Sequence, residues 1–395
     1  MNAIADKLSS IPFFKEIARA EIEATARFWS PARLRANERL WQQGSPAYEI
    51  AVLMTGELTA CYDGVEVGTI RPGELLGEVS AFILGGRRSA TVTATEDCQI
   101  LRLPNSALRT LRLEGSGVYQ TLLLQALQVL ARRIRLTDRR IAQLTSGTVN
   151  APTRTEPSRL RRWWRSLRST HPRSECPSLE NILRRQPGLQ SASDEAIQVL
   201  AKAFQPQSVE ENEVIFLEGE QGAAGYIVAE GKVEVLRHVR ASRAELLATL
   251  NPDDQFGMNT LVESGARTAS CVAATPGWLY RMDAADFHRL EGEARTLWYE
   301  NILASLATQI RNANASLRRA KQALPVKPGE TPVPTTPRPE EPVEEAPGEP
   351  PDDSFRELLR ASGFVEALPL SEKHLDKVQV ISTEDQKRSP HLKKN

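Results

Sequence analysis

Two long stretches of the chain place their apolar residues at alternating steps of four and three. Steps that average about 3.5 residues put each set on one stripe of an α-helix, and such a stripe is typical of helices that pair with another helix. The stripes are Leu123, Leu127, Leu130, Ile134, Thr137, Ile141 and Leu144, and Tyr299, Leu303, Leu306, Ile310, Ala313, Leu317 and Ala320. The sequence therefore predicts two long helices that pair with each other in one chain or, through residues 120–145, with a second copy in a homodimer.

The pattern before each long helix is an internal repeat. Residues 12–56 align with residues 187–231 at a constant offset and without a gap, so that Gly56 meets Gly231. Each copy runs from a short helical stretch through many short β-runs separated by Gly and Asp turns. Short strands joined by such turns close into antiparallel rolls. We expect a mainly β fold with α (α+β), in which two antiparallel, jelly-roll-like β-rolls each end in a long helix.

Composition divides the remaining chain. A basic segment with two tryptophans lies between the copies, and a stretch dense in Pro and Glu follows the second long helix. The latter composition cannot bury enough apolar surface to fold, so we expect it to be disordered. The expected parts are residues 1–145 (first domain), 146–178 (basic linker), 179–324 (second domain), 325–353 (disordered linker) and 354–395 (short C-terminal segment).

Charge and cysteine usage narrow the function classes. The 395 residues carry 50 basic and 50 acidic side chains, so the whole chain is not an electrostatic receptor for nucleic acid. The four cysteines form no C-x-x-C pair, which argues against a metal site or a disulfide framework. Residues 1–10 lack a signal-peptide pattern, and no apolar run reaches the ~18 residues of a membrane span. We expect a cytoplasmic protein.

The first repeat contains the run Gly-Glu-Val-Ser-Ala-Phe-Ile-Leu-Gly-Gly-Arg-Arg-Ser-Ala-Thr-Val at residues 77–92. This run, here called the first cassette, resembles the phosphate-binding cassette of cyclic nucleotide-binding domains. The order of turns and strands in both repeats is similar to that family as well. The resemblance implies a regulatory protein whose ligand is cyclic AMP or cyclic GMP.

The residue types suit such a ligand, which presents one phosphate anion and one free ribose 2′-hydroxyl. A turn that opens a short helix offers unpaired backbone N–H groups to the phosphate, and arginine adds a permanently charged fork. By resemblance, Arg88 binds the phosphate and Glu78 accepts a hydrogen bond from the 2′-hydroxyl. The implied ligand-binding residues of this copy are Gly77, Glu78, Val79, Arg88, Ser89 and Ala90. The alternative is that Glu78 and Arg88 form a purely structural pair.

The run Ala-Arg-Arg-Ile-Arg-Leu-Thr-Asp at residues 131–138 is similar to the helix of the bacterial catabolite activator family. In that family a threonine on the helix hydrogen-bonds the adenine, and Thr137 occupies the matching position. Thr137 is also the polar member of an otherwise apolar stripe. The resemblance thus implies a base contact at Thr137, which favours cyclic AMP.

The second repeat has the corresponding run at residues 257–272, here called the second cassette. Arg267, Thr268 and Ala269 keep the phosphate-binding pattern, and Arg-Thr is a pair that the family associates with cyclic GMP. Met258 replaces the glutamate, and Ala313 replaces the helix threonine. Loss of a hydrogen bond to a charged group weakens binding by roughly 10- to 100-fold. We expect the second domain to be weak, altered in its ligand, or structural.

Several functions compete. No recognition-helix pattern follows the first long helix, which argues against sequence-specific DNA as a partner, and no catalytic or metal constellation indicates an enzyme or a cofactor. The primary prediction is a regulator that binds cyclic nucleotide in its first domain and signals through its helices to an unidentified protein effector. The tandem order also resembles the regulatory subunit of cyclic-AMP-dependent protein kinase, without its inhibitor sequence. A scaffold that binds only proteins is the third reading.

The basic linker adds a possible partner. Residues 159–168 interleave arginines with Trp163 and Trp164, which suits an anionic membrane surface with the indoles at the interface. The same composition suits a nucleic-acid backbone, or a solvated linker whose tryptophans fold back onto a domain.

Overall fold

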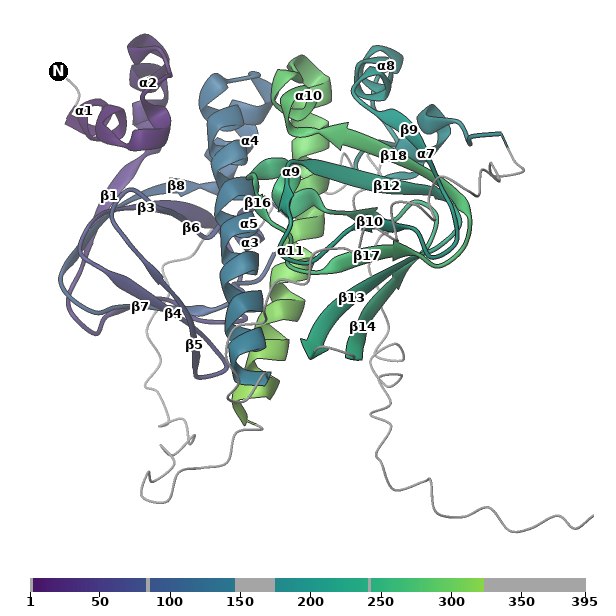
Figure 1. The fold of residues 1–395 in the computed structure, drawn as a ribbon. Helices are drawn as coiled ribbons and strands as arrows, with labels where there is room; N and C mark the ends of the chain where they lie inside the picture. The colour runs from purple at the N-terminus through teal and green to yellow at the C-terminus, as the bar shows by residue number, and fades with distance from the viewer. Residues whose placement is uncertain (1–2, 83–85, 146–174, 241–242, 323–395) are drawn as a thin grey trace, which may run out of the picture. The chain divides into compact units, whose positions relative to one another are not determined.

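A computed structural model describes residues 3–82, 86–145, 175–240 and 243–322 (Figure 1). The predictions for residues 159–168, 325–353 and 354–395 lie outside these ranges. Within them, no helix is both long and apolar enough to cross a membrane.

The first domain is an antiparallel β-roll of two four-stranded sheets, ordered β1-β8-β3-β6 and β2-β7-β4-β5. Its strands are β1 Ser30–Leu34, β2 Arg39–Trp41, β3 Glu49–Thr55, β4 Leu58–Tyr62, β5 Val65–Ile70, β6 Leu75–Leu76, β7 Thr91–Ala94 and β8 Cys98–Pro104. Its helices are α1 Ala3–Ser10, α2 Arg19–Thr25, α3 Glu78–Ala81, α4 Asn105–Leu113 and α5 Gly117–Thr145, with 3-10 turns η1 Pro12–Phe14 and η2 Ala26–Phe28.

The second domain repeats this plan, with sheets ordered β10-β17-β13-β14 and β15-β12-β18-β9 and a short β11-β16 pair. Its strands are β9 Gln205–Val209, β10 Val214–Phe216, β11 Gln221–Gly222, β12 Ala224–Glu230, β13 Val233–Arg240, β14 Arg243–Leu250, β15 Gln255–Phe256, β16 Gly265–Ala266, β17 Ser270–Ala273 and β18 Gly277–Asp283. Its helices are α7 Leu179–Arg185, α8 Asp194–Lys202, α9 Met258–Val262, α10 Ala284–Arg289 and α11 Gly292–Gln322. The predicted mainly β rolls followed by long helices are confirmed.

Local sequence explains how the strands close. Asp63 and Gly64 join β4 to β5, and both have a positive φ, at 46° and 77°. Two such residues form the tight hairpin turn whose twist matches that of paired strands. The two sheets of the first domain enclose an apolar layer that includes Leu53, Leu58 and Ile100, each at most 1% exposed.

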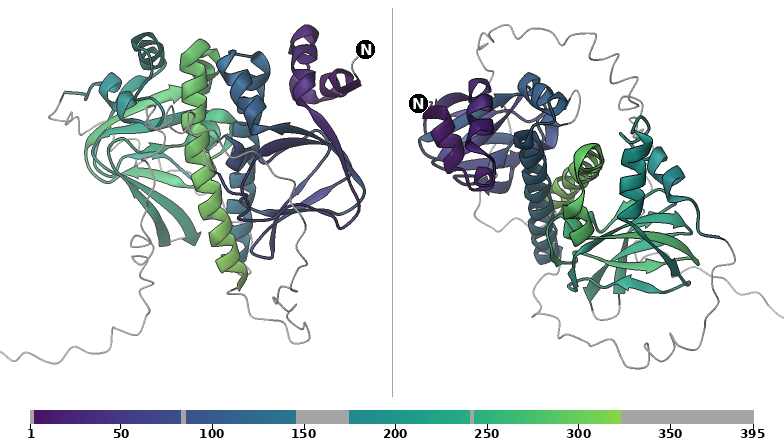
Figure 2. Two further views of the ribbon diagram at one scale, coloured as in Figure 1. Left: turned by 180° about the vertical axis from the view of Figure 1, so that it is seen from behind. Right: turned by 90° about the horizontal axis from the view of Figure 1, so that it is seen from above.

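The two long helices, α5 and α11, pack along each other in the same chain and run in the same direction (Figures 1 and 2). The apolar stripe residues Leu127, Leu130, Leu303 and Leu306 belong to one buried cluster and are at most 2% exposed. Near the start of both helices, the Tyr119 hydroxyl donates to Glu300 Oε1 over 2.6 Å. Of the two predicted pairings, the internal one is present in the structure.

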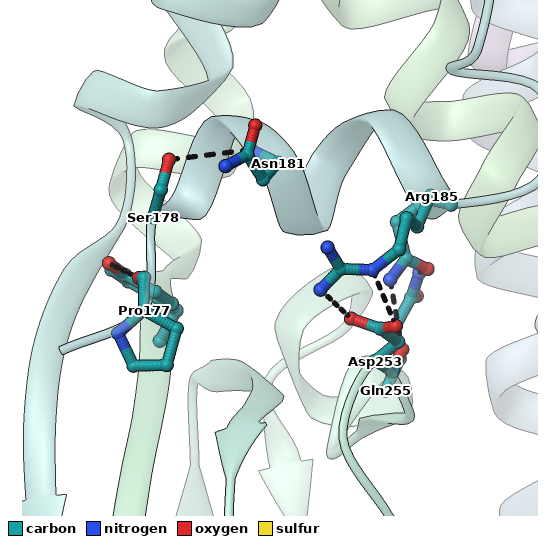
Figure 3. A network of polar contacts seen from close by, with 8 residues as sticks. Pro177, Ser178, Asn181, Arg185, Asp253 and Gln255 are labelled. Carbon is teal, nitrogen blue, oxygen red and sulfur yellow. Dashed lines mark hydrogen bonds and ion pairs between the residues drawn. The ribbon is translucent and has the colours of Figure 1, made fainter. Parts of the chain in front are cut away.

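The beginning of the second domain is held to its roll by a polar network (Figure 3). Ser178 caps α7 by accepting a hydrogen bond from the Asn181 backbone N–H, as is usual for serine before a helix. At the other end of α7, the Arg185 guanidinium forms two 2.8 Å bonds with the two oxygens of Asp253. Gln255 extends the network by donating to the Asn301 side chain on α11. The network therefore fixes α7 relative to both the roll and α11.

Candidate functional site

The first cassette begins with a turn that only glycine fits. Gly77 has a φ of 85° and precedes α3. A Cβ atom at this position would lie 2.7 Å from Arg88 Nη1 and 2.9 Å from the Trp41 ring. Such distances are shorter than van der Waals contact, and the positive φ is itself unfavourable for other residues. The glycine thus lets the backbone at the start of α3 approach the Arg88 guanidinium.

Arg88 is a buried cation with unused hydrogen-bond donors. Its side chain is 4% exposed, and its guanidinium carbon lies 3.5 Å from the centroid of the Trp41 ring. Neither Nε nor Nη1 has a hydrogen-bond partner. Burial lowers the pKa of Arg88 to about 10, and the charges of Glu49 and Glu78 oppose that shift. The group is therefore charged at neutral pH, and an anion would satisfy its free donors.

Glu78 is fully buried at the first position of α3. Its Oε1 accepts a 2.6 Å hydrogen bond from Arg133 Nη1 on α5, whereas its Oε2 has no donor. Arg133 is not among the residues that the sequence predicts for this site. The available signal was its spacing: Arg133 lies four residues before Thr137, which places both on the same helix face.

The other predicted residues of this copy lie on the same elements. Val79 is a buried residue of α3, and Ser89 and Ala90 are half-buried in the segment between Arg88 and β7. Thr137 is 2% exposed on α5, one turn beyond Arg133. The structure therefore brings Glu78 to α5 through Arg133, although no direct contact between Glu78 and Thr137 is present among the described interactions.

The second cassette has the same backbone plan but different polar partners. Gly257 again has a positive φ, 72°, and precedes α9. Arg267 is 6% exposed and lies 3.9 Å from the centroid of the Phe216 ring. Its Nη1 donates to the Gly257 carbonyl over 3.3 Å and to the Thr260 hydroxyl. Burial lowers the pKa of Arg267.

These bonds change the expectation for Arg267. Met258 stands where the first cassette has Glu78, so no carboxylate at that position balances Arg267. The structure supplies two neutral acceptors instead, although Arg267 Nε still has no partner. The sequence signal was Thr260, which lies three residues after Gly257, where the first cassette has Ser80. Part of the hydrogen-bonding capacity of this arginine is therefore already used within the domain.

The core beside the second cassette contains larger side chains than the core beside the first. Tyr226 and Phe256 stack with ring centroids 5.0 Å apart, and both are buried. The residues at the corresponding positions of the first domain are Ala51 on β3 and Leu76 on β6. Larger side chains thus occupy the second roll where the first has smaller ones.

Comparison with known proteins agrees with this geometry. The family model for the cyclic nucleotide-binding domain matches twice, at residues 31–114 and 206–292. A cGMP-dependent protein kinase, egl-4, of Caenorhabditis elegans is 23% identical over 296 residues, which are 74% of this chain and 31% of the kinase. A CRP-like cAMP-activated global transcriptional regulator of Mycobacterium tuberculosis is 32% identical over 139 residues, which are 35% of this chain and 62% of the regulator.

Among solved structures, the cAMP-bound regulatory domain of Toxoplasma gondii PKA is 16% identical, with a TM-score of 0.28. That match covers 75% of this chain and 93% of the Toxoplasma domain. The chain spans less than two thirds of the length of the kinase and the regulator that it matches. Residues 31–114 and 206–292 thus both belong to the cyclic nucleotide-binding domain family, in tandem within one chain.

Proposed function

We propose that the first domain binds a cyclic nucleotide, with cyclic AMP preferred, and that the chain is a cytoplasmic regulator that passes this event to a protein effector. In this proposal Arg88 binds the phosphate with Ser89 and the Ala90 amide, and Glu78 binds the ribose 2′-hydroxyl. The backbone at Gly77 and Val79 faces the phosphate, and Thr137 contacts the base.

The observation that carries the proposal is a buried arginine and a buried glutamate that both have hydrogen-bonding atoms without a partner. Arg88 has two buried N–H groups without an acceptor, and Glu78 has one buried oxygen without a donor. Buried polar groups in folded proteins are nearly always paired, so these three atoms call for a partner. A molecule with a phosphate anion and a hydroxyl satisfies all three at once.

The Arg133–Glu78 bond supports the route of the signal. Because Arg133 holds Oε1, the free Oε2 of Glu78 can accept the ribose hydroxyl without breaking that bond. The nucleotide would then be linked to α5 through a charged hydrogen bond, and α5 packs against α11 of the second domain. A ligand shifts a conformational equilibrium only through contacts that differ between states, and in this proposal the nucleotide's own contact with Glu78 is that contact.

The nucleotide preference is supported by two observations. The first is the buried hydroxyl of Thr137 on α5, which matches the base contact of the catabolite activator family. The second is the relative from Mycobacterium tuberculosis, whose name describes it as cAMP-activated and which is 32% identical over 139 residues.

Displacement of a fluorescent cyclic AMP analogue from the full chain tests the proposal. Arg88→Ala should weaken binding by at least about 100-fold, because it removes the charged donors from a buried phosphate site. Arg267→Ala is the matched control from the second domain and should leave that affinity within about twofold. Binding that is unaffected by Arg88→Ala would reject the proposed site.

Regulation of a protein kinase is the second candidate, favoured by the alignment with egl-4 across both domains. It predicts that the chain inhibits a cognate kinase and that cyclic nucleotide releases the inhibition. A phosphorylation assay with and without the nucleotide separates this candidate from other effectors.

A further inference from the structure

The long helix of the first domain lies on the cassette of the second. On α5, Arg135 donates to the Glu263 carbonyl over 2.8 Å and to Glu263 Oε2 over 2.5 Å, and Arg132 lies 3.8 Å from Glu263 Oε1. Glu263 directly follows α9, so it belongs to the second cassette. Side chains three residues apart share a helix face, so Asp138, three residues after Arg135, continues along this strip.

Asp138 reaches the part of the second cassette that corresponds to a phosphate site. Burial raises the pKa of Asp138, whereas the charge of Arg237 on β13 and the Thr268 side chain lower it, which places both groups beside this carboxyl. Thr268 follows Arg267 just as Ser89 follows Arg88, so it occupies the position of a phosphate ligand by sequence. A carboxylate of the chain itself thus lies beside the side chain whose hydroxyl a bound phosphate would use.

The other long helix, α11, has a different residue at the position that corresponds to Asp138. When Thr137 is aligned with Ala313, Asp138 corresponds to Asn314 on α11. Asn314 is 5% exposed, and its Oδ1 has no partner. It lies one turn before Arg318, which forms a 2.5 Å ion pair with Asp63 of the first domain. The helix facing the first domain therefore carries a neutral amide where the helix facing the second domain carries a carboxylate.

We propose that the second cassette is an internal docking site for α5, in which Asp138 takes the Thr268 hydroxyl and keeps cyclic nucleotides out. The ligand of the second domain is then the helix of the first. An anionic phosphate at Thr268 would meet the Asp138 charge at close range, and like charges brought together are strongly unfavourable. This inference concerns the second domain and does not require that the first binds nucleotide.

The test is photoaffinity labelling of the full chain with 8-azido cyclic AMP at millimolar concentration, mapped by mass spectrometry to peptides of each domain. Asp138→Asn keeps the shape of the side chain and removes its charge. We expect labelling of second-domain peptides to be near background in the native chain and to rise about tenfold in Asp138→Asn. Glu114→Gln, at an exposed carboxylate beyond α4, is the matched control and should label like the native chain.

Amide hydrogen exchange at residues 265–270 is the second readout. Asp138→Ala and Thr268→Val should each speed exchange there by roughly threefold, because either removes the same contact. The double variant should add little to either single change, since groups that act through one interaction are not additive. Such non-additivity supports the docking contact, whereas fully additive effects or unchanged exchange would refute it.

Labelling of the two domains separates this inference from the proposed function. Second-domain labelling in the native chain, or none in Asp138→Asn, would overturn the docking proposal whatever happens in the first domain. Absence of first-domain labelling would count against the proposed function alone.

Discussion

Arg88 and Arg267 are corresponding residues with different surroundings. Both are buried, and both guanidinium groups lie over an aromatic ring. Arg88 has a buried carboxylate nearby and two unpaired N–H groups, whereas Arg267 donates to the carbonyl of Gly257 and the hydroxyl of Thr260. A buried cation with free donors favours an incoming anion, and one with internal acceptors gains less from it. The second domain has Met258 where the first has Glu78, and its arginine donates hydrogen bonds within the domain, whereas Arg88 keeps free donors.

The raised pKa of Asp138 predicts that the stability of the fold decreases as the pH rises. Burial raises the pKa of Asp138 to about 6, and the hydrogen bond from Thr268 and the charge of Arg237 oppose that shift. In the unfolded chain this carboxyl titrates near pH 4. Between about pH 4 and 6 the folded state therefore binds the extra proton, so this group's stabilising contribution is full below pH 4 and is lost as the pH rises through 6.

Urea unfolding of the native chain and Asp138→Asn over pH 4–7 measures this contribution. The stability of the native chain relative to the variant should fall by about 1–2 kcal/mol across that range, after allowance for the partial exposure of Asp138. A difference that stays constant with pH, or that grows with pH, would show that the pKa of Asp138 is not raised.

Sequence reasoning predicted part of the candidate site. Glu78, Arg88 and Thr137 were identified because a family pattern fixes their spacing along the chain, and all three are buried. Arg133 and Asp138 were missed as contributors because their partners lie far away in sequence, Glu78 on α3 and Thr268 in the other domain. A helix stripe shows which residues share a face but not what that face meets.

At the scale of elements, the start of α11 is tied to the first domain by a buried cluster. Glu300 is 9% exposed and accepts two bonds from Arg112, at 2.6 and 2.9 Å, as well as the bond from Tyr119. Burial and the charge of Glu300 raise the pKa of Tyr119 well above its usual value, so its hydroxyl stays a donor. The Tyr119 ring also contacts Phe82, at the end of α3, with centroids 6.0 Å apart. The cluster therefore connects the first cassette to α11.

Removing the carboxylate of this cluster should destabilise the helix pair. Glu300→Ala leaves Arg112 and Tyr119 without their shared acceptor, and because Glu300 is buried while Arg112 is partly exposed, the loss should cost roughly 1–2 kcal/mol. Chemical denaturation measures the change, with Glu291→Ala, an exposed residue just before α11, as the control. If both variants lose equally little stability, the cluster does not hold the helices together.

The elements themselves were largely predictable because their signals are local. Heptad spacing indicated α5 and α11, and the repeat indicated that both rolls follow one plan. The stripe left open whether α5 pairs with α11 or with its own copy, because both partners offer an apolar stripe with the same spacing. Contacts between distant residues, such as Arg112 with Glu300, decide that choice in the structure.

At the scale of the molecule, two related domains pair through their long helices in one chain. The α5 stripe is covered by α11, with Leu130 fully buried. A stripe that is already covered offers little apolar surface to a second copy. The internal pairing therefore takes the place that a homodimer through residues 120–145 would have used.

Light scattering at micromolar concentration should accordingly give the mass of one chain. Leu130→Glu places a charge in the covered stripe, which should separate the helices and expose them, so that this variant aggregates or dimerises. The matched change Leu136→Glu, at a half-exposed position of α5, should leave the mass unchanged. A tight dimer of the native chain that Leu130→Glu converts to monomers would contradict the internal pairing as the state in solution.

A calorimetric titration of the full native chain with cyclic AMP and cyclic GMP tests the central claim most directly, because it counts sites as well as measuring affinity. The arrangement of Arg88 and Glu78 in the first domain, and of Arg267 and Met258 in the second, predicts one strong site per chain with tighter binding of cyclic AMP. Two equivalent sites, or no binding of either nucleotide, would contradict it.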